Sequence, residues 1–183
     1  MRSLRALLVG LLPLLTLAAC VQVNGRAGGL APRYSQPFVA VPSVSAGPVP
    51  TGYDPHADAP AAVAAAQAAS RKDGRPVLVE FGADWCADCQ VLAQRSATPG
   101  AWLVLARNYH LVTVDVGHFD RNSALAARWI DLKRSGIPAL VVLDPDGRVR
   151  ATTQDGSFAN ARSLSVDALT NRLVDWLYPA SRS

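Results

Sequence analysis

The sequence predicts an α/β fold over residues 56–183, preceded by a disordered tether over residues 20–55. The 56–183 segment has the size of a single domain, and helix-like and strand-like segments alternate along it. The tether, in contrast, is rich in Pro, Gly, Ala, Ser and Val, with almost no charge and no sustained periodicity. It holds too few regularly spaced large apolar residues to offset the entropy lost on ordering. An extra edge strand over residues 34–41 is the alternative for part of it.

The first half of the domain alternates between helix and strand. Residues 60–71 are alanine-rich and predict a helix, and the short, apolar, β-branched run 77–82 predicts a buried strand. A helix is expected over 86–95, and a Thr-Pro pair then predicts the N-cap and first turn of another helix over 99–108. Residues 111–116 predict the second strand.

The second half adds a helix, a hairpin and a closing helix. Residues 121–132 have helical composition, and residues 139–143 predict a third strand. The Asp-Pro-Asp-Gly sequence at 144–147 is typical of a turn, so residues 148–153 are expected to return as the second strand of a hairpin. A serine N-cap predicts a final helix over 166–177 with one apolar side.

The N-terminal segment has the pattern of a secretory signal. Basic residues precede the apolar stretch 6–17, which is shorter than the roughly 20 residues that a membrane-spanning helix needs. The Leu-Ala-Ala-Cys sequence ending at Cys20 resembles the lipobox of bacterial lipoproteins. This resemblance implies that residues 1–19 are removed as a signal peptide and that Cys20 is the lipid attachment site. Val21 follows this cysteine at the position where inner-membrane sorting patterns have an aspartate, which favours the outer membrane. An ordinary secreted protein with a spare thiol is the alternative.

Two cysteines follow the strand predicted over 77–82, within the sequence Trp-Cys-Ala-Asp-Cys at 85–89. They lie three positions apart on the first turn of the expected helix, where they are close enough to form a disulfide. The helix N-terminus stabilises a thiolate on the first of them. We therefore expect Cys86 to be a nucleophile and Cys89 to be its resolving thiol.

A Cys-x-x-Cys pair is also half of a zinc site, and it can form a purely structural disulfide. The chain holds three cysteines and three histidines. Neither a second cysteine pair nor a His-x-x-x-His sequence supplies the two further ligands that a tetrahedral site needs. The sequence therefore favours a redox-active disulfide, with no metal and no other cofactor.

Two segments carry a resemblance to the thioredoxin family. They are residues 81–89 (Phe-Gly-Ala-Asp-Trp-Cys-Ala-Asp-Cys) and residues 136–140 (Gly-Ile-Pro-Ala-Leu), and the order of predicted elements also matches that family. The resemblance implies a thioredoxin-like fold, in which helices flank a central mixed β-sheet, and thiol-disulfide oxidoreductase activity. The Ala-Asp-Trp lead-in at 83–85 and the interrupted helix after the motif are more similar to the thioredoxin-like domains of bacterial envelope electron-transfer proteins than to cytoplasmic thioredoxin.

The resemblance also implies roles for four residues around the dithiol. Pro138 would form a cis peptide bond facing the disulfide, and the backbone of Ile137 would pair with an extended substrate segment. Trp85 would shield the disulfide and contribute to docking. Glu80, the only glutamate of the chain, would replace a buried aspartate that moves protons to and from the resolving cysteine, because burial raises the pKa of a carboxyl. The alternative is that Glu80 faces water at the strand end.

The two residues between the cysteines, Ala87 and Asp88, depart from the family pattern. Thioredoxin carries Gly-Pro there, and strongly oxidising members carry Pro-His. An anion beside the nucleophile disfavours the thiolate and so destabilises the reduced form. Asp88 therefore favours a reductant, unless its side chain points away into solvent. His118 is interpreted as a solvated loop histidine rather than a catalytic one, as no partner is identifiable in the sequence.

The charge of the chain gives no reason to expect nucleic-acid binding. The formal charge is +4, and loss of two arginines with the signal peptide leaves 16 basic and 14 acidic residues. The basic residues are scattered rather than clustered.

We therefore expect a monomeric, lipid-anchored protein-disulfide reductase that faces the periplasm and acts on disulfides of protein substrates. The sequence has no second dithiol, flavin motif or nucleotide loop, so an upstream membrane electron donor is expected to regenerate the dithiol. Two alternatives stay open: a non-catalytic, chaperone-like module that binds peptides, and a disulfide-forming oxidase.

Overall fold

The structure is a computed structural model, and it describes residues 52–178. The predicted signal peptide, the lipid attachment at Cys20, the alternative edge strand at 34–41 and most of the predicted tether lie outside the described residues. Among the helices of residues 52–178, none is both long and apolar enough to cross a membrane.

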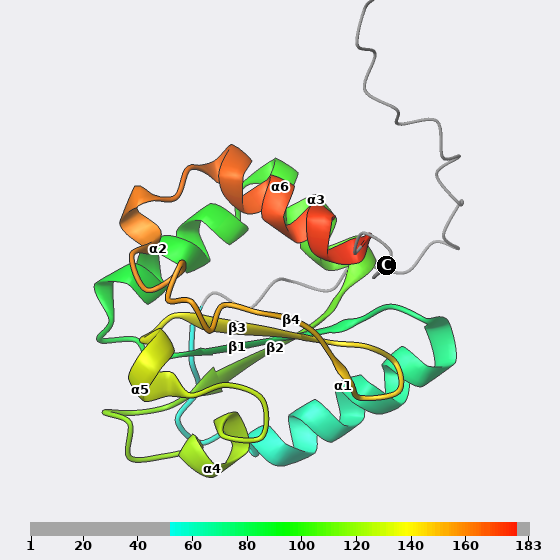
Figure 1. The fold of residues 1–183 in the computed structure, drawn as a ribbon, viewed down its shortest axis with the longest axis horizontal. Helices are drawn as coiled ribbons and strands as arrows, with labels where there is room; N and C mark the ends of the chain where they lie inside the picture. The colour runs from blue at the N-terminus through cyan, green and yellow to red at the C-terminus, as the bar shows by residue number, and fades with distance from the viewer. Residues whose placement is uncertain (1–51, 179–183) are drawn as a thin grey trace, which may run out of the picture. The chain divides into compact units, whose positions relative to one another are not determined.

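Four strands form one mixed sheet in the order β2-β1-β3-β4 (Figure 1). The central strand β1 (Val77–Gly82) pairs in parallel with β2 (His110–Asp115) and antiparallel with β3 (Ala139–Leu143). A turn closed by a 2.8 Å hydrogen bond from the Gly147 N–H to the Asp144 carbonyl leads to β4 (Val149–Thr152), which pairs antiparallel with β3. The predicted mixed sheet is confirmed, with the predicted bounds of the first and third strands.

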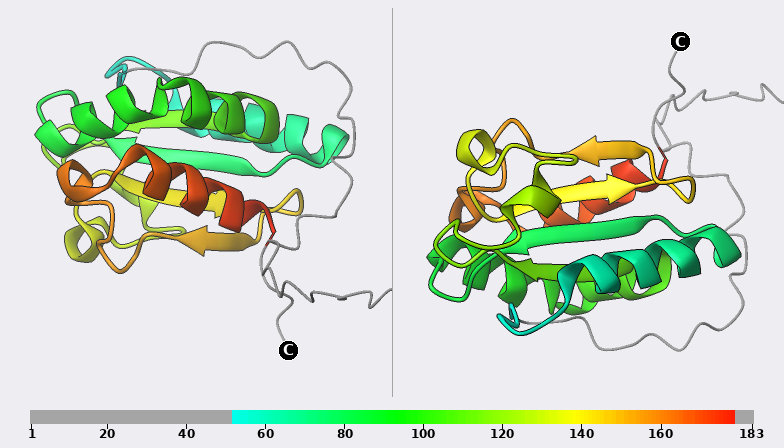
Figure 2. Two further views of the ribbon diagram at one scale, coloured as in Figure 1. Left: turned by 90° about the horizontal axis from the view of Figure 1, so that it is seen from above. Right: turned by 90° about the horizontal axis from the view of Figure 1, so that it is seen from below.

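Helices cover both faces of this sheet (Figure 1, Figure 2). One face carries α1 (Ala59–Asp73) with the short helices α4 (Ser123–Ala126) and α5 (Leu132–Ser135), and the other carries α2 (Ala87–Ser96), α3 (Pro99–Asn108) and α6 (Val166–Leu177). A 3₁₀ turn, η1 (Ala161–Ser163), precedes α6 and contacts α2. The helices over 99–108 and 166–177 are confirmed at their predicted bounds.

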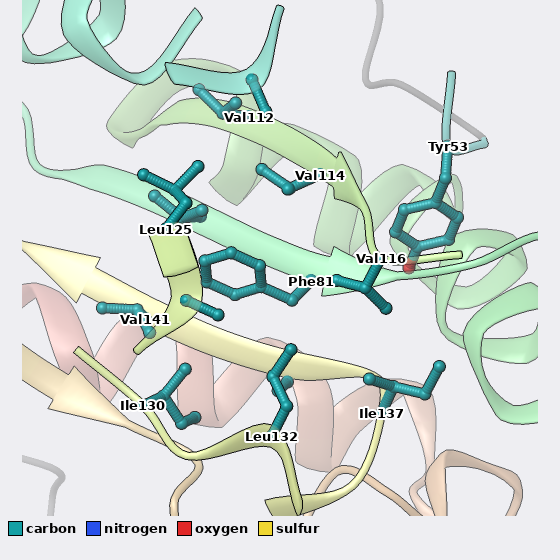
Figure 3. Packing of buried hydrophobic residues seen from close by; sticks show 14 of the residues in the cluster. Tyr53, Phe81, Val112, Val114, Val116, Leu125, Ile130, Leu132, Ile137 and Val141 are labelled. Carbon is teal, nitrogen blue, oxygen red and sulfur yellow. The ribbon is translucent and has the colours of Figure 1, made fainter. Parts of the chain in front are cut away.

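Strand alternation divides the apolar residues into two cores. Val77, Val79 and Phe81 of β1 point toward α1 and α4, where they join the cluster shown in Figure 3. Leu78 points to the opposite face and packs in the cluster formed with α2, α3 and α6. Glu80 lies on the same side of β1 as Leu78, so the strand carries this carboxyl beneath α2.

The helix predicted over 121–132 is wrong. The segment forms only α4 (Ser123–Ala126), and a new helix, α5 (Leu132–Ser135), starts after a break. Both backbone groups of Asp131 bond to the Gln154 side chain instead of continuing a helix, at 2.8 Å and 3.2 Å. The Asp131 carboxylate accepts a 2.9 Å hydrogen bond from the Lys133 N–H and so caps α5. A distant glutamine therefore interrupts a segment whose composition is helical.

The domain begins before the predicted boundary at residue 56. Tyr53 is 4% exposed and belongs to the same apolar cluster as Phe81 and the two cysteines. The Thr113 hydroxyl donates a 3.1 Å hydrogen bond to the carbonyl of Gly52. The last residues of the predicted tether are therefore part of the folded unit.

Candidate active site

The two cysteines lie at the start of α2, as free thiols with different exposure. Cys86 is the N-cap residue, with extended backbone, and its sulfur accepts a 3.3 Å hydrogen bond from the Cys89 N–H. Cys86 is 7% exposed and Cys89 0%. The helix N-terminus therefore offers an N–H to the sulfur of the less buried cysteine, while the second cysteine is fully enclosed.

The Gly136–Pro138 segment lies across from Cys86. The Ile137–Pro138 peptide bond is cis, as the resemblance implies, and both residues are buried. The Cys86 thiol donates a 3.6 Å hydrogen bond to the carbonyl of Ile137. Gly136, at φ 68°, has the left-handed conformation that glycine adopts without strain. This turn brings a backbone carbonyl, 51 positions away in sequence, to the nucleophilic sulfur.

Glu80 is buried beneath α2, at 6% exposure, rather than at a wet strand end. Burial raises the pKa of this carboxyl to about 7, although a hydrogen bond from the Tyr53 hydroxyl acts in the opposite direction. A carboxyl with such a pKa exchanges its proton at neutral pH, which is the property that a general acid-base group needs.

Cys89 interacts electrostatically with this acid. Burial raises the pKa of Cys89 above its ordinary value, and a hydrogen bond with Cys86 raises it further. A backbone hydrogen bond from Ala83 lowers it, and the charges of Cys86 and Glu80 add smaller increases. Cys89 therefore stays protonated at neutral pH unless a base takes its proton, and Glu80 is placed to do so.

Tyr53 is a site residue that the sequence analysis missed. Its hydroxyl donates a hydrogen bond to Glu80 Oε1, and its own pKa is raised by burial and then by the neighbouring Glu80 and Cys89. The one available signal was a large aromatic residue at the end of a segment of small residues. Its partner is 27 positions away, so the pairing depends on the tertiary fold.

An exposed aromatic group lies next to the dithiol. The Trp85 ring, 51% exposed, stacks on His118 with ring centroids 5.0 Å apart and meets Phe119 edge-on at 6.5 Å. The indole N–H donates a 2.8 Å hydrogen bond to the Gly117 carbonyl, which fixes the ring. His118 is thus exposed, as predicted, but it supports Trp85 from its loop.

A cavity of about 270 Å³ begins at Phe119 and extends between α4 and α5. It is lined by Phe119, Ser123, Ala127, Ile130, Asp131, Leu132 and Lys133. Within residues 52–178, no group of three or more His, Cys, Asp or Glu side chains is placed to hold a metal ion.

Residues 55–145 match the family described as thioredoxin-like. The solved structure described as the disulphide isomerase from Xylella fastidiosa Temecula1 is 38% identical, with a TM-score of 0.66, and the match covers 70% of this chain and 98% of that one. The chain belongs to the thioredoxin family. The thiol:disulfide interchange protein DsbD 1 of Pseudomonas aeruginosa is 32% identical over 109 residues, which are 59% of this chain and 18% of that protein. This thioredoxin-family chain thus spans less than a fifth of that curated relative.

In this member of the thioredoxin family, Asp88 is buried and paired rather than free. Its Oδ1 accepts hydrogen bonds from the Arg162 backbone N–H at 2.9 Å and from Arg162 Nε at 3.1 Å. A cation thus partly compensates the carboxylate between the two cysteines. The electrostatic argument for a reductant, which assumed an unpaired anion, is therefore weaker than the sequence suggests. No sequence motif identifies Arg162 as a partner of Asp88, because the two residues lie 74 positions apart.

Arg162→Gln is expected to make the Cys86–Cys89 pair more reducing. Without the guanidinium, the Asp88 carboxylate acts uncompensated on the nearby thiols and destabilises the reduced form. Because Arg162 is largely exposed, the effect is expected to be a shift of about 10–20 mV toward more negative potential. Equilibration with a dithiol buffer and thiol trapping measure it. Asp88→Asn is the matched variant and is expected to shift the potential in the opposite direction. A shift of the same sign in both variants would contradict the explanation.

Proposed function

We propose that this chain is a thiol-disulfide oxidoreductase of the bacterial envelope that acts as a protein-disulfide reductase. The observation that carries the proposal is the asymmetry of the dithiol. Cys86 caps a helix N-terminus and keeps 7% exposure, whereas Cys89 is fully buried near Glu80 and has a raised pKa. A thiol with a raised pKa is a poor leaving group, so the Cys86–Cys89 disulfide closes more readily than it opens. That bias favours passing electrons to a substrate.

The reaction has two exchange steps. The Cys86 thiolate attacks one sulfur of a substrate disulfide, forming a mixed disulfide and releasing the other substrate sulfur as a thiolate, which takes a proton from water. Glu80 then accepts the proton of Cys89, and the Cys89 thiolate attacks the Cys86 sulfur. The second substrate sulfur leaves as a thiolate, and Cys86 and Cys89 become a disulfide. Two electrons have moved from this chain to the substrate.

The surface around Cys86 supports a protein substrate. Trp85, next to the nucleophile in the chain, and Phe119, which contacts its ring, expose aromatic area, and the Ile137 carbonyl lies at the Cys86 sulfur. An extended substrate segment that places its disulfide at Cys86 would contact both groups. Aromatic side chains of this kind commonly anchor protein partners.

The cellular setting of the proposal rests on the N-terminal sequence and on the named relatives. A lipid on Cys20 would hold a monomeric protein at the membrane, and Val21 favours the outer membrane. The tether would carry the domain into the periplasm. The oxidised dithiol must be reduced again by an upstream membrane electron donor. The name of the DsbD 1 relative, a thiol:disulfide interchange protein, agrees with this exchange chemistry.

Disulfide isomerisation is the second candidate, because the relative from Xylella fastidiosa carries that name. Isomerisation uses the same attack by Cys86 but ends with a substrate thiol displacing it, so it needs neither Cys89 nor an electron donor. Activity of Cys89→Ala on a scrambled substrate, with no loss relative to the wild type, would favour it over reduction.

The reduction potential of the Cys86–Cys89 pair tests the proposed direction. The full chain carrying Cys20→Ser leaves only the two site thiols to titrate. A potential of roughly −270 mV is expected for a reductase, and a value of roughly −120 mV would mean a disulfide-forming oxidase. In parallel, Cys86→Ala is expected to reduce insulin no faster than the chemical reductant alone. Undiminished activity of Cys86→Ala would support the non-catalytic, chaperone-like alternative.

A further inference from the structure

Tyr53 is held in place by hydrogen bonds on both sides of its backbone. Its N–H donates to Asp84 Oδ1 at 3.0 Å, and the hydroxyl of Thr113 donates to the carbonyl of the preceding Gly52 at 3.1 Å. Asp84 belongs to the turn just before the cysteines, and Thr113 lies on β2. The segment that enters the domain is thus hydrogen-bonded to the turn that follows β1 and to the adjacent strand β2.

The position of the Tyr53 ring depends on Gly82, the last residue of β1. A Cβ atom at residue 82 would overlap the ring of Tyr53, including its hydroxyl. The ring therefore occupies the space that a side chain at this position would fill. Figure 3 shows Tyr53 entering the apolar cluster from the N-terminal segment, with its hydroxyl oxygen turned toward the end of β1.

The hydroxyl of Tyr53 meets the buried acid of the site. It donates a hydrogen bond to Glu80 Oε1 in a position where both side chains are shielded from water. Cys89 belongs to the same buried cluster as Tyr53. The cross-strand neighbours of Glu80 are Thr113 on β2 and Leu140 on β3, and neither carries a titratable group. The titratable groups that act on Glu80 in the described residues are therefore Tyr53 and Cys89.

We propose that Tyr53 is a positioning residue of the active site, whose hydroxyl holds the Glu80 carboxylate in place and stabilises it as the acceptor of the Cys89 proton. The proposal rests on the proposed function, because only a resolving Cys89 needs that acceptor. A hydrogen bond donated to a buried carboxylate favours its charged form, and loss of the donor leaves the charge unsatisfied.

The consequence for Glu80 has a definite sign. Burial alone raises the pKa of this carboxyl, and the Tyr53 hydrogen bond acts against burial, with a net value of about 7. Without the phenol the pKa rises further, so that Glu80 stays protonated at neutral pH. A protonated Glu80 cannot take the Cys89 proton. Tyr53 therefore keeps the resolving step active at neutral pH.

The test uses the fact that Glu80 is the only glutamate of the chain. Cell-free synthesis of the full chain with δ-¹³C-glutamate gives one carboxyl resonance, which is titrated by NMR. The wild type is expected to show a midpoint near pH 7. Tyr53→Phe keeps the ring over Gly82 but removes the donor, and its midpoint is expected about one pH unit higher. An unchanged midpoint in a folded Tyr53→Phe chain would overturn the proposal.

Tyr109→Phe is the matched control, because Tyr109 is also buried and donates a 2.5 Å hydrogen bond, but to the Leu173 carbonyl in the other core. This variant is expected to leave the Glu80 midpoint where it is in the wild type. A shift as large in Tyr109→Phe as in Tyr53→Phe would mean a general loss of packing and would overturn the assignment.

A kinetic readout connects the hydrogen bond to the reaction. Cys86 is converted to its mixed disulfide with glutathione, and release of glutathione by Cys89 is followed against pH. The acid limb of this profile is expected to move upward by about one pH unit in Tyr53→Phe, in step with the NMR midpoint. If the wild type releases no glutathione at any pH, the proposed function fails, while the NMR titration still decides whether Tyr53 stabilises the Glu80 carboxylate.

Discussion

Glu80→Gln is expected to stabilise the folded chain at pH 8 by about 3 kcal/mol while it slows disulfide exchange. In the folded state, Glu80 keeps its proton up to a pKa of about 7, against an ordinary value of 4.5. Between these two values the unfolded chain has lost the proton and the folded chain still holds it. The contribution of Glu80 to stability is therefore complete below about pH 4.5, falls as pH rises toward 7, and stays low above it. Glutamine does not ionise in this pH range, so its contribution to stability does not change with pH in this way.

Urea unfolding at pH 5 and at pH 8 measures this effect. The two chains are expected to differ little at pH 5, and Glu80→Gln to be the more stable at pH 8. Asp73→Asn is a control of opposite sign. Partial burial acts to raise the pKa of the Asp73 carboxyl, but hydrogen bonds from His110 and Arg75 outweigh burial and hold this pKa below its ordinary value. Asp73 therefore contributes stability that is present at pH 8 and lost in acid, and its replacement destabilises the chain at pH 8. An equal effect of Glu80→Gln at both pH values would contradict the assignment of a raised pKa.

The same substitution is expected to slow the attack of Cys89 by about a hundredfold, the usual lower range for loss of a general base. The mixed disulfide with Cys86 would then accumulate, and thiol trapping during turnover would detect it. Formation of the mixed disulfide itself is expected to keep its rate, because Glu80 takes part only in the later step, as acceptor of the Cys89 proton. A variant that is both more stable and slower would show that the site retains a destabilising buried charge for its chemistry.

Gly82→Ala is expected to destabilise the chain by about 1–3 kcal/mol, because the added methyl group would overlap the Tyr53 ring. The backbone of Gly82 lies outside the left-handed region, so the cost comes from the overlap and not from backbone strain. Displacing the ring also removes the hydroxyl from Glu80, and the Glu80 midpoint is expected to rise as it does in Tyr53→Phe.

A double-mutant cycle with Tyr53→Ala tests this explanation. Once the ring is gone, Gly82→Ala is expected to cost little, so the two substitutions are strongly non-additive. Gly100→Ala is the matched control: its Cβ would meet no atom within 4 Å, and alanine in the α3 helix is expected to stabilise the chain by up to about 1 kcal/mol. Additive costs in the cycle would show that Tyr53 is not what limits residue 82.

The elements predicted best are those with local signals at their ends. Thr98 and Pro99 start α3, and the hydroxyl of Ser165 caps α6 with a 3.1 Å hydrogen bond from the Ala168 N–H. The hydroxyl of Thr98 instead donates to the Arg95 carbonyl at 2.6 Å, so the position was predicted correctly although its side chain bonds elsewhere. The prediction of a helix over 121–132 failed because Gln154, which is distant in sequence, bonds to the backbone of Asp131, and no local pattern shows this contact.

The candidate site divides in the same way. The dithiol, Glu80 and the Ile137–Pro138 bond lie in short sequence motifs, and the structure gathers them at the start of α2. Tyr53 and Arg162 lie outside those motifs and reach their partners only in the folded chain. Sequence patterns identify groups that react, whereas groups that act on them through tertiary contacts have no fixed spacing.

The place of Tyr53 in the chain separates the control of protons from the control of electrons. The match to the thioredoxin-like family model starts at residue 55, and the residue that hydrogen-bonds the buried acid comes just before that match. A substitution at position 53 can therefore change the pH range of the reaction while leaving the dithiol motif intact. Evolution, or an engineer, could adapt this chain to a more acidic or more alkaline compartment by editing a segment that holds none of the electron-transferring atoms.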